Sequence, residues 1–135
     1  MRHESLTPTR ALLLGFPIAL FLGGLLSDIA YYRSFEIQWA NFAAWLNAGA
    51  LVFGGIVLAL SALDFFRHRE RRGRAGLYLL LVAAMWIVGF FNALVHARDG
   101  WAMMPMGLVL SVIVVCLAIA AAVVGMRSTR RVETV

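Results

Sequence analysis

Residues 90–111 read FFNALVHARDGWAMMPMGLVLS, and this stretch decides how the chain folds. It leaves one long apolar run, passes through a short polar and aromatic segment, and enters a second apolar run at Pro105. Two apolar runs joined by a short connection predict a hairpin of two antiparallel helices. The stretch also gathers more chemically capable side chains than any other part of the sequence, so a candidate site is expected there.

The composition indicates a chain embedded in lipid. Of 135 residues, 62% are hydrophobic and 14% are charged, whereas soluble domains carry about 25% charged residues. The mean hydropathy is +0.85. So few polar side chains cannot cover the surface of a small soluble domain, and the sequence therefore predicts a single integral membrane domain.

Four apolar runs are long enough to cross a membrane, which takes about 20 residues. Short polar connections separate these runs, which cover residues 11–32, 39–63, 75–97 and 105–126. Short connections place consecutive helices side by side and antiparallel, so we expect an all-α, four-helix transmembrane bundle. The bundle is flanked by polar tails at residues 1–10 and 127–135.

Pro17 lies inside the first apolar run. Proline has no backbone N–H, so it leaves the carbonyl of Leu13 without its helical partner. We expect the first helix to break there, with residues 9–15 lying partly along the membrane interface.

All 12 basic residues are arginines, and they are distributed unequally between the two sides of the bundle. Arg33 and Arg98 lie on one side, and the other ten lie in the two tails and in the basic loop of residues 67–74: Arg2, Arg10, Arg67, Arg69, Arg71, Arg72, Arg74, Arg127, Arg130 and Arg131. Cytoplasmic loops carry an excess of arginine and lysine, so both termini and the basic loop are predicted to be cytoplasmic. Because the arginines follow the ends of apolar runs, the net charge of +5 does not indicate a nucleic-acid partner.

Several polar side chains are expected near the outer face of the membrane. Asn92, His96 and Asp99 follow i, i+4, i+7 spacing and would share one face of a helix. With neighbouring residues and the outer ends of the first two runs, they form a candidate outer-face polar cluster of Asp28, Asn41, Asn92, His96, Arg98 and Asp99. We expect Asp28, Asn92 and His96 to approach one another, because ionisable groups at membrane depth need partners. The alternative interpretation is structural, with solvated charges, packing asparagines and a histidine that caps its helix.

A metal or haem site is a further alternative. His3 and His68 fall on the cytoplasmic side, about 30 Å from His96 along a helix of 20 residues, so neither can bind the same iron as His96 within one chain. His96 with a methionine could bind haem, and with several methionines it offers ligands that suit Cu(I). The candidate metal ligands are His96, Met103, Met104 and Met106.

Three stretches resemble a known family. Residues 91–101, FNALVHARDGW, with Pro105 and Gly107, are similar to the closing half of a bacterial family of small membrane proteins, domain of unknown function 2231. Residues 16–20 with Asp28 resemble its first helix, and the glycine-rich second run ending at Asp64 resembles its second. The resemblance covers about residues 8–126 and implies a four-helix inner-membrane protein without an assigned reaction. The family's His-Pro pairs before Phe-Pro are replaced here by Thr7-Pro8.

The sequence shows no catalytic triad, zinc-binding pair or phosphate-binding loop, and Ser111 is interpreted as a helix-packing residue rather than a nucleophile. We therefore expect a multi-pass protein of the bacterial inner membrane that is not an enzyme. It would act as a structural or interaction subunit of a membrane complex, in contact with the lipid bilayer and able to form homo-oligomers. The alternative is a membrane redox component that binds haem, copper or quinone at the outer polar cluster.

Overall fold

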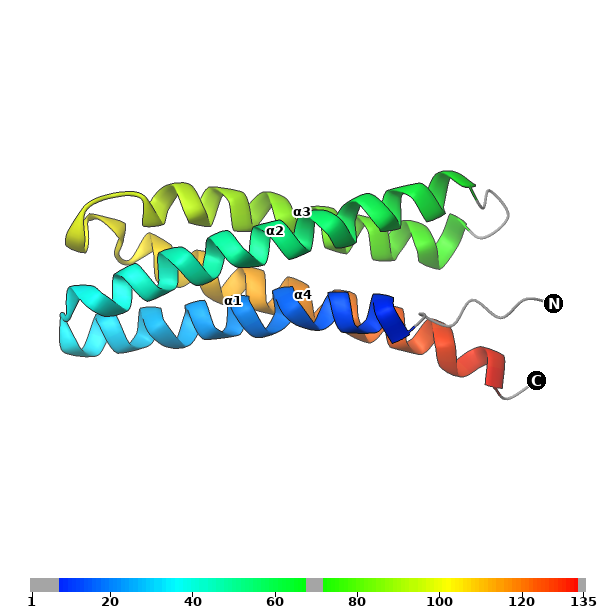
Figure 1. Ribbon diagram of the computed structural model, residues 1–135, viewed down its shortest axis with the longest axis horizontal. Coiled ribbons are helices and arrows are strands. Elements are labelled where there is room, and N and C mark those ends of the chain that lie inside the picture. The colour runs from blue at the N-terminus through cyan, green and yellow to red at the C-terminus, as the bar shows by residue number, and fades with distance from the viewer. Residues whose placement is uncertain (1–7, 68–71, 134–135) are drawn as a thin grey trace.

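The computed structural model describes the backbone of residues 8–67 and 72–133, and the side chains of residues 8–67 and 73–127. Within these ranges the chain forms four long helices and one 3-10 helix, as Figure 1 shows. These are α1 (Pro8–Ser34), α2 (Ile37–Arg67), α3 (Arg72–His96), η2 (Gly100–Met103) and α4 (Met106–Glu133). Each long helix is long and apolar enough to cross a membrane, so the expected four candidate spans are confirmed.

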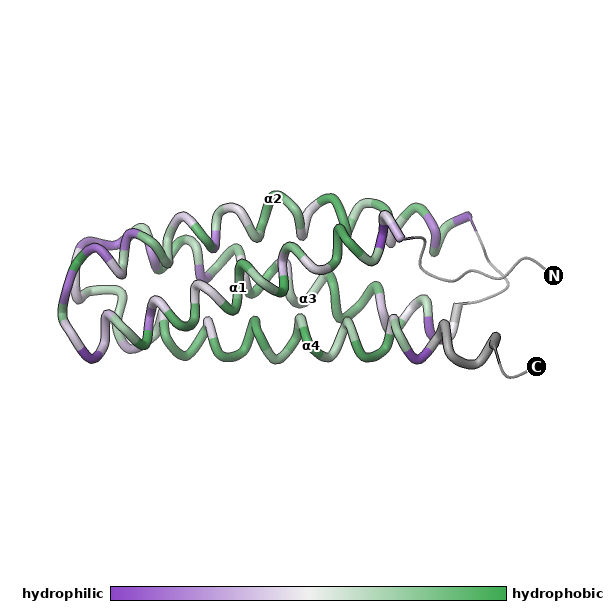
Figure 2. Tube along the Cα trace, turned by 60° about the horizontal axis from the view of Figure 1, so that its bottom comes forward, coloured by the Kyte–Doolittle hydropathy of each residue, from purple (hydrophilic) through white to green (hydrophobic). Residues whose placement is uncertain are grey.

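The helices form a closed antiparallel bundle in which each packs against the two that flank it, α1 against α2 and α4, and α3 against α2 and α4. The α1–α2 and α3–α4 connections lie at one end, and the start of α1 and the end of α4 lie at the other (Figure 1). We call the first the aromatic end, because Tyr31, Tyr32, Phe35 and Trp101 pack together there. Figure 2 shows hydrophilic segments toward both ends of the bundle and hydrophobic segments between them.

Most of the helices extend beyond the apolar runs from which they were predicted. Helix α1 begins at Pro8 and α4 continues to Glu133, so both expected tails are partly helical. Helix α2 likewise continues to Arg67, whereas α3 ends at His96, one residue before the expected limit. Hydropathy marks the part of a helix that lies in lipid, and the backbone hydrogen bonds of a helix continue into water until a breaker ends them.

Helix α1 runs through Pro17 without interruption from Pro8 to Ser34, so the expected break is wrong. The proline ring is buried and packs beside α2, where a Cβ on Gly54 would lie 3.9 Å from that of Pro17. Proline is tolerated in membrane helices where a neighbouring helix supports the altered backbone. The glycine allows α2 to supply that support.

Buried residues recur at alternating steps of three and four along every helix, the spacing of left-handed bundles. The positions in this series are Leu14, Pro17, Phe21, Gly24, Asp28 and Tyr31 on α1; Ala40, Ala43, Asn47, Ala50, Gly54 and Val57 on α2; Val82, Met85, Gly89, Asn92 and His96 on α3; and Gly107, Ser111, Val114, Ala118, Ala121 and Gly125 on α4. Ser27 and Val115 are buried beside it. The centre of the bundle is therefore a stack of layers, most of which take one residue from each helix.

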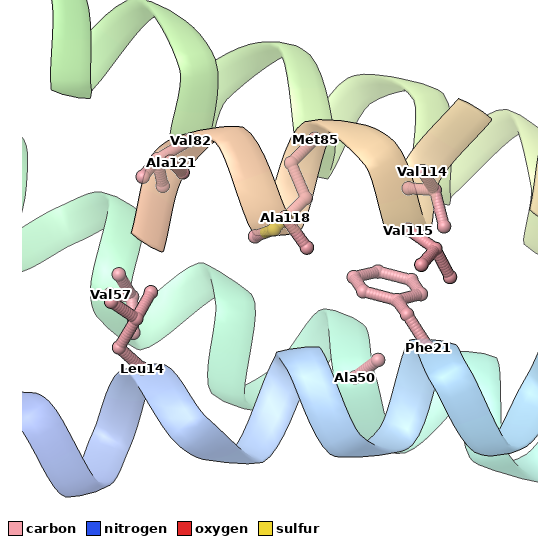
Figure 3. Packing of buried hydrophobic residues seen from close by; sticks show 10 residues of the cluster. All are labelled: Leu14, Phe21, Ala50, Val57, Val82, Met85, Val114, Val115, Ala118 and Ala121. Atoms are coloured by element: carbon pink, nitrogen blue, oxygen red, sulfur yellow. The ribbon is translucent and has the colours of Figure 1, made fainter. Parts of the chain in front are cut away.

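The layers in the half away from the aromatic end are apolar. Figure 3 shows the ring of Phe21 on α1 directed across the bundle toward Val114 and Val115 of α4. A Cβ on Gly89 would lie only 2.8 Å from Cζ of Phe21, so the glycine allows this ring to fill the centre. This tightly packed layer separates the apolar half of the bundle from the layers nearer the aromatic end.

Candidate functional site

Two consecutive layers next to Phe21 are polar. The first, which we call the amide layer, consists of Gly24, Asn47, Asn92 and Ser111. The second, the Asp–His layer, consists of Asp28, Ala43, His96 and Gly107. Glycines create the space: a Cβ on Gly24 would lie 3.0 Å from Oδ1 of Asn47, and one on Gly107 would lie 3.1 Å from Cε1 of His96.

Four of these side chains, Asp28, Asn92, His96 and Ser111, form a hydrogen-bonded group that we call the polar cluster. Nε2 of His96 lies 2.8 Å from Oδ1 of Asp28. Ser111 donates its hydroxyl to Oδ2 of Asp28 at 2.5 Å, and Nδ2 of Asn92 donates to Oγ of Ser111 at 3.0 Å. Nδ1 of His96 lies 2.8 Å from the carbonyl oxygen of Asn92. The cluster is buried and ties together α1, α3 and α4.

The hydrogen bonds restrict where protons sit on the imidazole. Nδ1 of His96 faces a backbone carbonyl, which only accepts, so Nδ1 carries a proton. One more proton lies between Nε2 and Asp28, giving either an imidazolium with a carboxylate or a neutral imidazole with a carboxylic acid. Both arrangements have zero net charge, which reduces the cost of burying the pair at membrane depth.

Apolar side chains also cover the cluster on the side of the aromatic end. Tyr31, Ala40, Met103 and Met104 form a buried group there, with Val95 and Leu108 packed against it. Trp101 lies over this group, with its ring centroid 5.6 Å from that of Tyr31. The cluster is therefore enclosed between this group and the Phe21 layer, inside the bundle rather than on an outer rim.

The structure brings together three of the six residues in the candidate outer-face cluster: Asp28, Asn92 and His96. The other three, Asn41, Arg98 and Asp99, are exposed and lie outside the polar cluster. Asp99 does not share a face with His96, because α3 ends at His96 and the chain then turns toward η2. The i+7 spacing holds only along a continuous helix.

The candidate metal ligands are separated by their environments. Met103 and Met104 are buried in the apolar group with Tyr31, whereas Met106 is exposed. Both ring nitrogens of His96 are engaged in hydrogen bonds, so the histidine would have to leave Asp28 or Asn92 to bind a metal. Within the described ranges, no group of three or more His, Cys, Asp and Glu residues is arranged to hold a metal ion. His3 and His68 lie outside those ranges.

The basic loop is described in part. Arg67 ends α2 and Arg72 begins α3, while Arg69 and Arg71 lie outside the described residues. Arg74 is exposed and its Nη1 donates to the carbonyl oxygen of Arg127 at 3.3 Å, which links the start of α3 to α4.

Ser111, which the sequence indicated to be a helix-packing residue, and Asn47 were both left out of the candidate site. Ser111 joins α4 to both Asp28 and Asn92. Its hydroxyl donates to Asp28 rather than to the imidazole of His96, so the array does not have the serine–histidine hydrogen bond of a nucleophilic triad. Its spacing from other buried residues could have placed Ser111 in the interior of the bundle, because it lies four residues after Gly107 and three before Val114.

A family model described as a predicted membrane protein (DUF2231) matches residues 7–134. The chain belongs to the DUF2231 family. The expected resemblance is thereby confirmed, and the match includes all four helices and the whole polar cluster. No curated protein and no solved structure matches this DUF2231 chain.

Proposed function

We propose that this DUF2231 chain is a non-catalytic, multi-pass subunit or interaction protein of a bacterial inner-membrane complex. The proposal rests on the hydrogen bonds of the polar cluster. Both carboxylate oxygens of Asp28 and both ring nitrogens of His96 form bonds that join helices or stabilise α3. These groups therefore stabilise the bundle. A partner would bind to its outer surface.

The layers above and below the polar cluster support a structural role. A catalytic or transport site needs a route by which a substrate reaches the reacting group. Here Phe21 fills the bundle on one side, and Met103 and Met104 with Tyr31 cover the other. The buried residues instead give the bundle a defined register, a role documented for buried polar groups in coiled coils.

The distribution of arginines supports an orientation with both termini in the cytoplasm. Arg10, Arg67, Arg74 and Arg127 lie on the parts of the helices farthest from the aromatic end (Figure 1). The positive-inside rule then assigns that end to the cytoplasm and the aromatic end to the outer interface. A helical bundle fits the inner membrane, because bacterial outer-membrane proteins are typically β-barrels.

Large apolar side chains point outward from every helix, as expected for surfaces that face lipid or another membrane protein. Trp45 on α2 is the most exposed of them, at 78%. A partner or a second copy of the chain would cover one such face and leave the others in lipid.

Photo-crosslinking combined with co-purification tests the proposal. The full-length chain would be tagged and produced at its native level, with a photoreactive residue replacing one lipid-facing side chain on each helix: Leu26, Trp45, Leu80 or Ile119. We expect one membrane protein, or a second copy, to be recovered at a fixed ratio in mild detergent and to crosslink from some faces and not others.

A monomeric preparation that crosslinks to no protein from any of the four faces would contradict the proposal. A Soret absorbance band or stoichiometric copper in the purified protein would support the redox alternative instead.

A further inference from the structure

Three polar atoms of the amide layer are buried without a hydrogen-bond partner in the described part of the chain: Oδ1 and Nδ2 of Asn47, and Oδ1 of Asn92. Both residues are 0% exposed. An unsatisfied amide in an apolar interior is destabilising, and lipid offers it no substitute for water.

The two asparagines occupy the same level of the bundle. Asn47 packs against Gly24, which lies one turn before Asp28 on α1. Asn92 bonds to Ser111, which bonds to Asp28. Since α2 and α3 pack against each other, the two amides belong to the same layer on adjacent helices. Nδ2 of Asn92 is held by Ser111, so its Oδ1 lies on the other side of the amide.

We propose that the amide layer binds water between Asn47 and Asn92. The unpartnered atoms are two acceptors and one donor, a set that water satisfies, because a water molecule both donates and accepts. Buried waters in proteins make about three hydrogen bonds to otherwise unsatisfied polar groups. A cation would suit the two oxygens and leave Nδ2 of Asn47 unsatisfied, so an uncharged hydrogen-bonding molecule fits better.

Water in this layer extends the hydrogen-bonded chain that runs from His96 through Asp28 and Ser111 to Asn92. The extended chain still ends at the Phe21 layer, where apolar side chains fill the bundle. The polar layers thus form a hydrated compartment that does not continue into the apolar half of the bundle. This hydration is independent of whether the chain has a protein partner.

Water-edited solid-state NMR on the full-length protein in lipid bilayers tests the inference directly. The matched control is the indole N–H of Trp86, which is partly buried on α3 and donates to the carbonyl oxygen of Leu51 at 3.0 Å. We expect the side-chain amide of Asn47 to receive water magnetisation several times faster than the indole. Equal, slow transfer at both groups would overturn the inference, including the case in which the two amides bond directly.

Asn47→Leu supplies an independent readout. If the amide is dry and unpartnered, its removal raises the midpoint of unfolding in detergent; if water joins it to Asn92, the midpoint falls. We expect a fall, and a smaller one when Asn92→Leu is already present. A rise in the midpoint would contradict water binding. Stabilisation of the unaltered protein by Na⁺, relative to choline at equal ionic strength, would show a cation site and overturn the inference as well.

Discussion

Asp28 on α1 and His96 on α3 hydrogen-bond at 2.8 Å with no side-chain surface exposed, although 68 residues separate them in the chain. Two helices that are not sequence neighbours are thereby joined in the interior of the bundle. Removing one partner of such a buried pair leaves the other uncompensated, whereas replacing both by apolar groups can be nearly neutral. The pair is therefore the most informative place to measure what holds the bundle together.

We predict that Asp28→Val and His96→Leu each destabilise the protein by about 3–5 kcal/mol, because each leaves its partner buried and unpaired. In the double variant, the free energy of unfolding should fall by clearly less than the sum of the two single losses. Unfolding in mixed micelles of mild detergent and SDS, followed by circular dichroism, measures all three values. Additive losses would show that the two residues act independently and would contradict the pairing.

The ion pair between Arg10 and Asp64 provides a matched comparison. It joins α1 to α2 near the start of α1, but its side chains are 37% and 35% exposed. Solvent screens such pairs, so Asp64→Asn should reduce stability by at most about 1 kcal/mol. The same unfolding assay applies, and a loss as large as that of Asp28→Val would show that burial does not distinguish the two pairs.

Gly89→Ala should destabilise the bundle by about 1–3 kcal/mol through overpacking. Its Cβ would lie 2.8 Å from Cζ of Phe21 and 3.2 Å from Leu51 Cδ2. Gly15→Ala is the control, because a Cβ there meets no atom within 4 Å. It should be neutral or stabilise by up to about 1 kcal/mol through helix propensity. Thermal unfolding in detergent compares the two, and Phe21→Leu should partly restore the stability of Gly89→Ala.

Much of the fold followed from the sequence, because hydropathy is a direct measure of what lipid accepts. Four long apolar runs with short connections leave little freedom beyond an antiparallel bundle, and the structure has that architecture. The exact helix ends did not follow, since Arg67 and Glu133 are compatible with helix outside lipid. The predicted break at Pro17 was wrong, because the prediction considered only the lost backbone hydrogen bond and not the support that α2 supplies at Gly54.

The candidate site was predictable in part for a similar reason. Asp28, Asn92 and His96 belong to the buried three-and-four series, so the packing that buries them also brings them together. Asn47 and Ser111 belong to the same series but were not included in the candidate site, because neutral side chains do not stand out until burial is known. Asp99 was included wrongly in the helical face because composition did not reveal that α3 ends at His96.

Cysteine labelling should decide which end of the bundle faces the cytoplasm. The native Cys116 would be replaced by alanine, and a single cysteine would be introduced at an exposed position of either end, by Asp99→Cys or Arg67→Cys. Because arginines favour the cytoplasmic side, we expect a membrane-impermeant maleimide to label the Asp99→Cys variant in intact spheroplasts. The Arg67→Cys variant should react only after the membrane is permeabilised. The reverse pattern would invert the orientation and place the basic loop outside, while leaving the fold and the polar cluster unchanged.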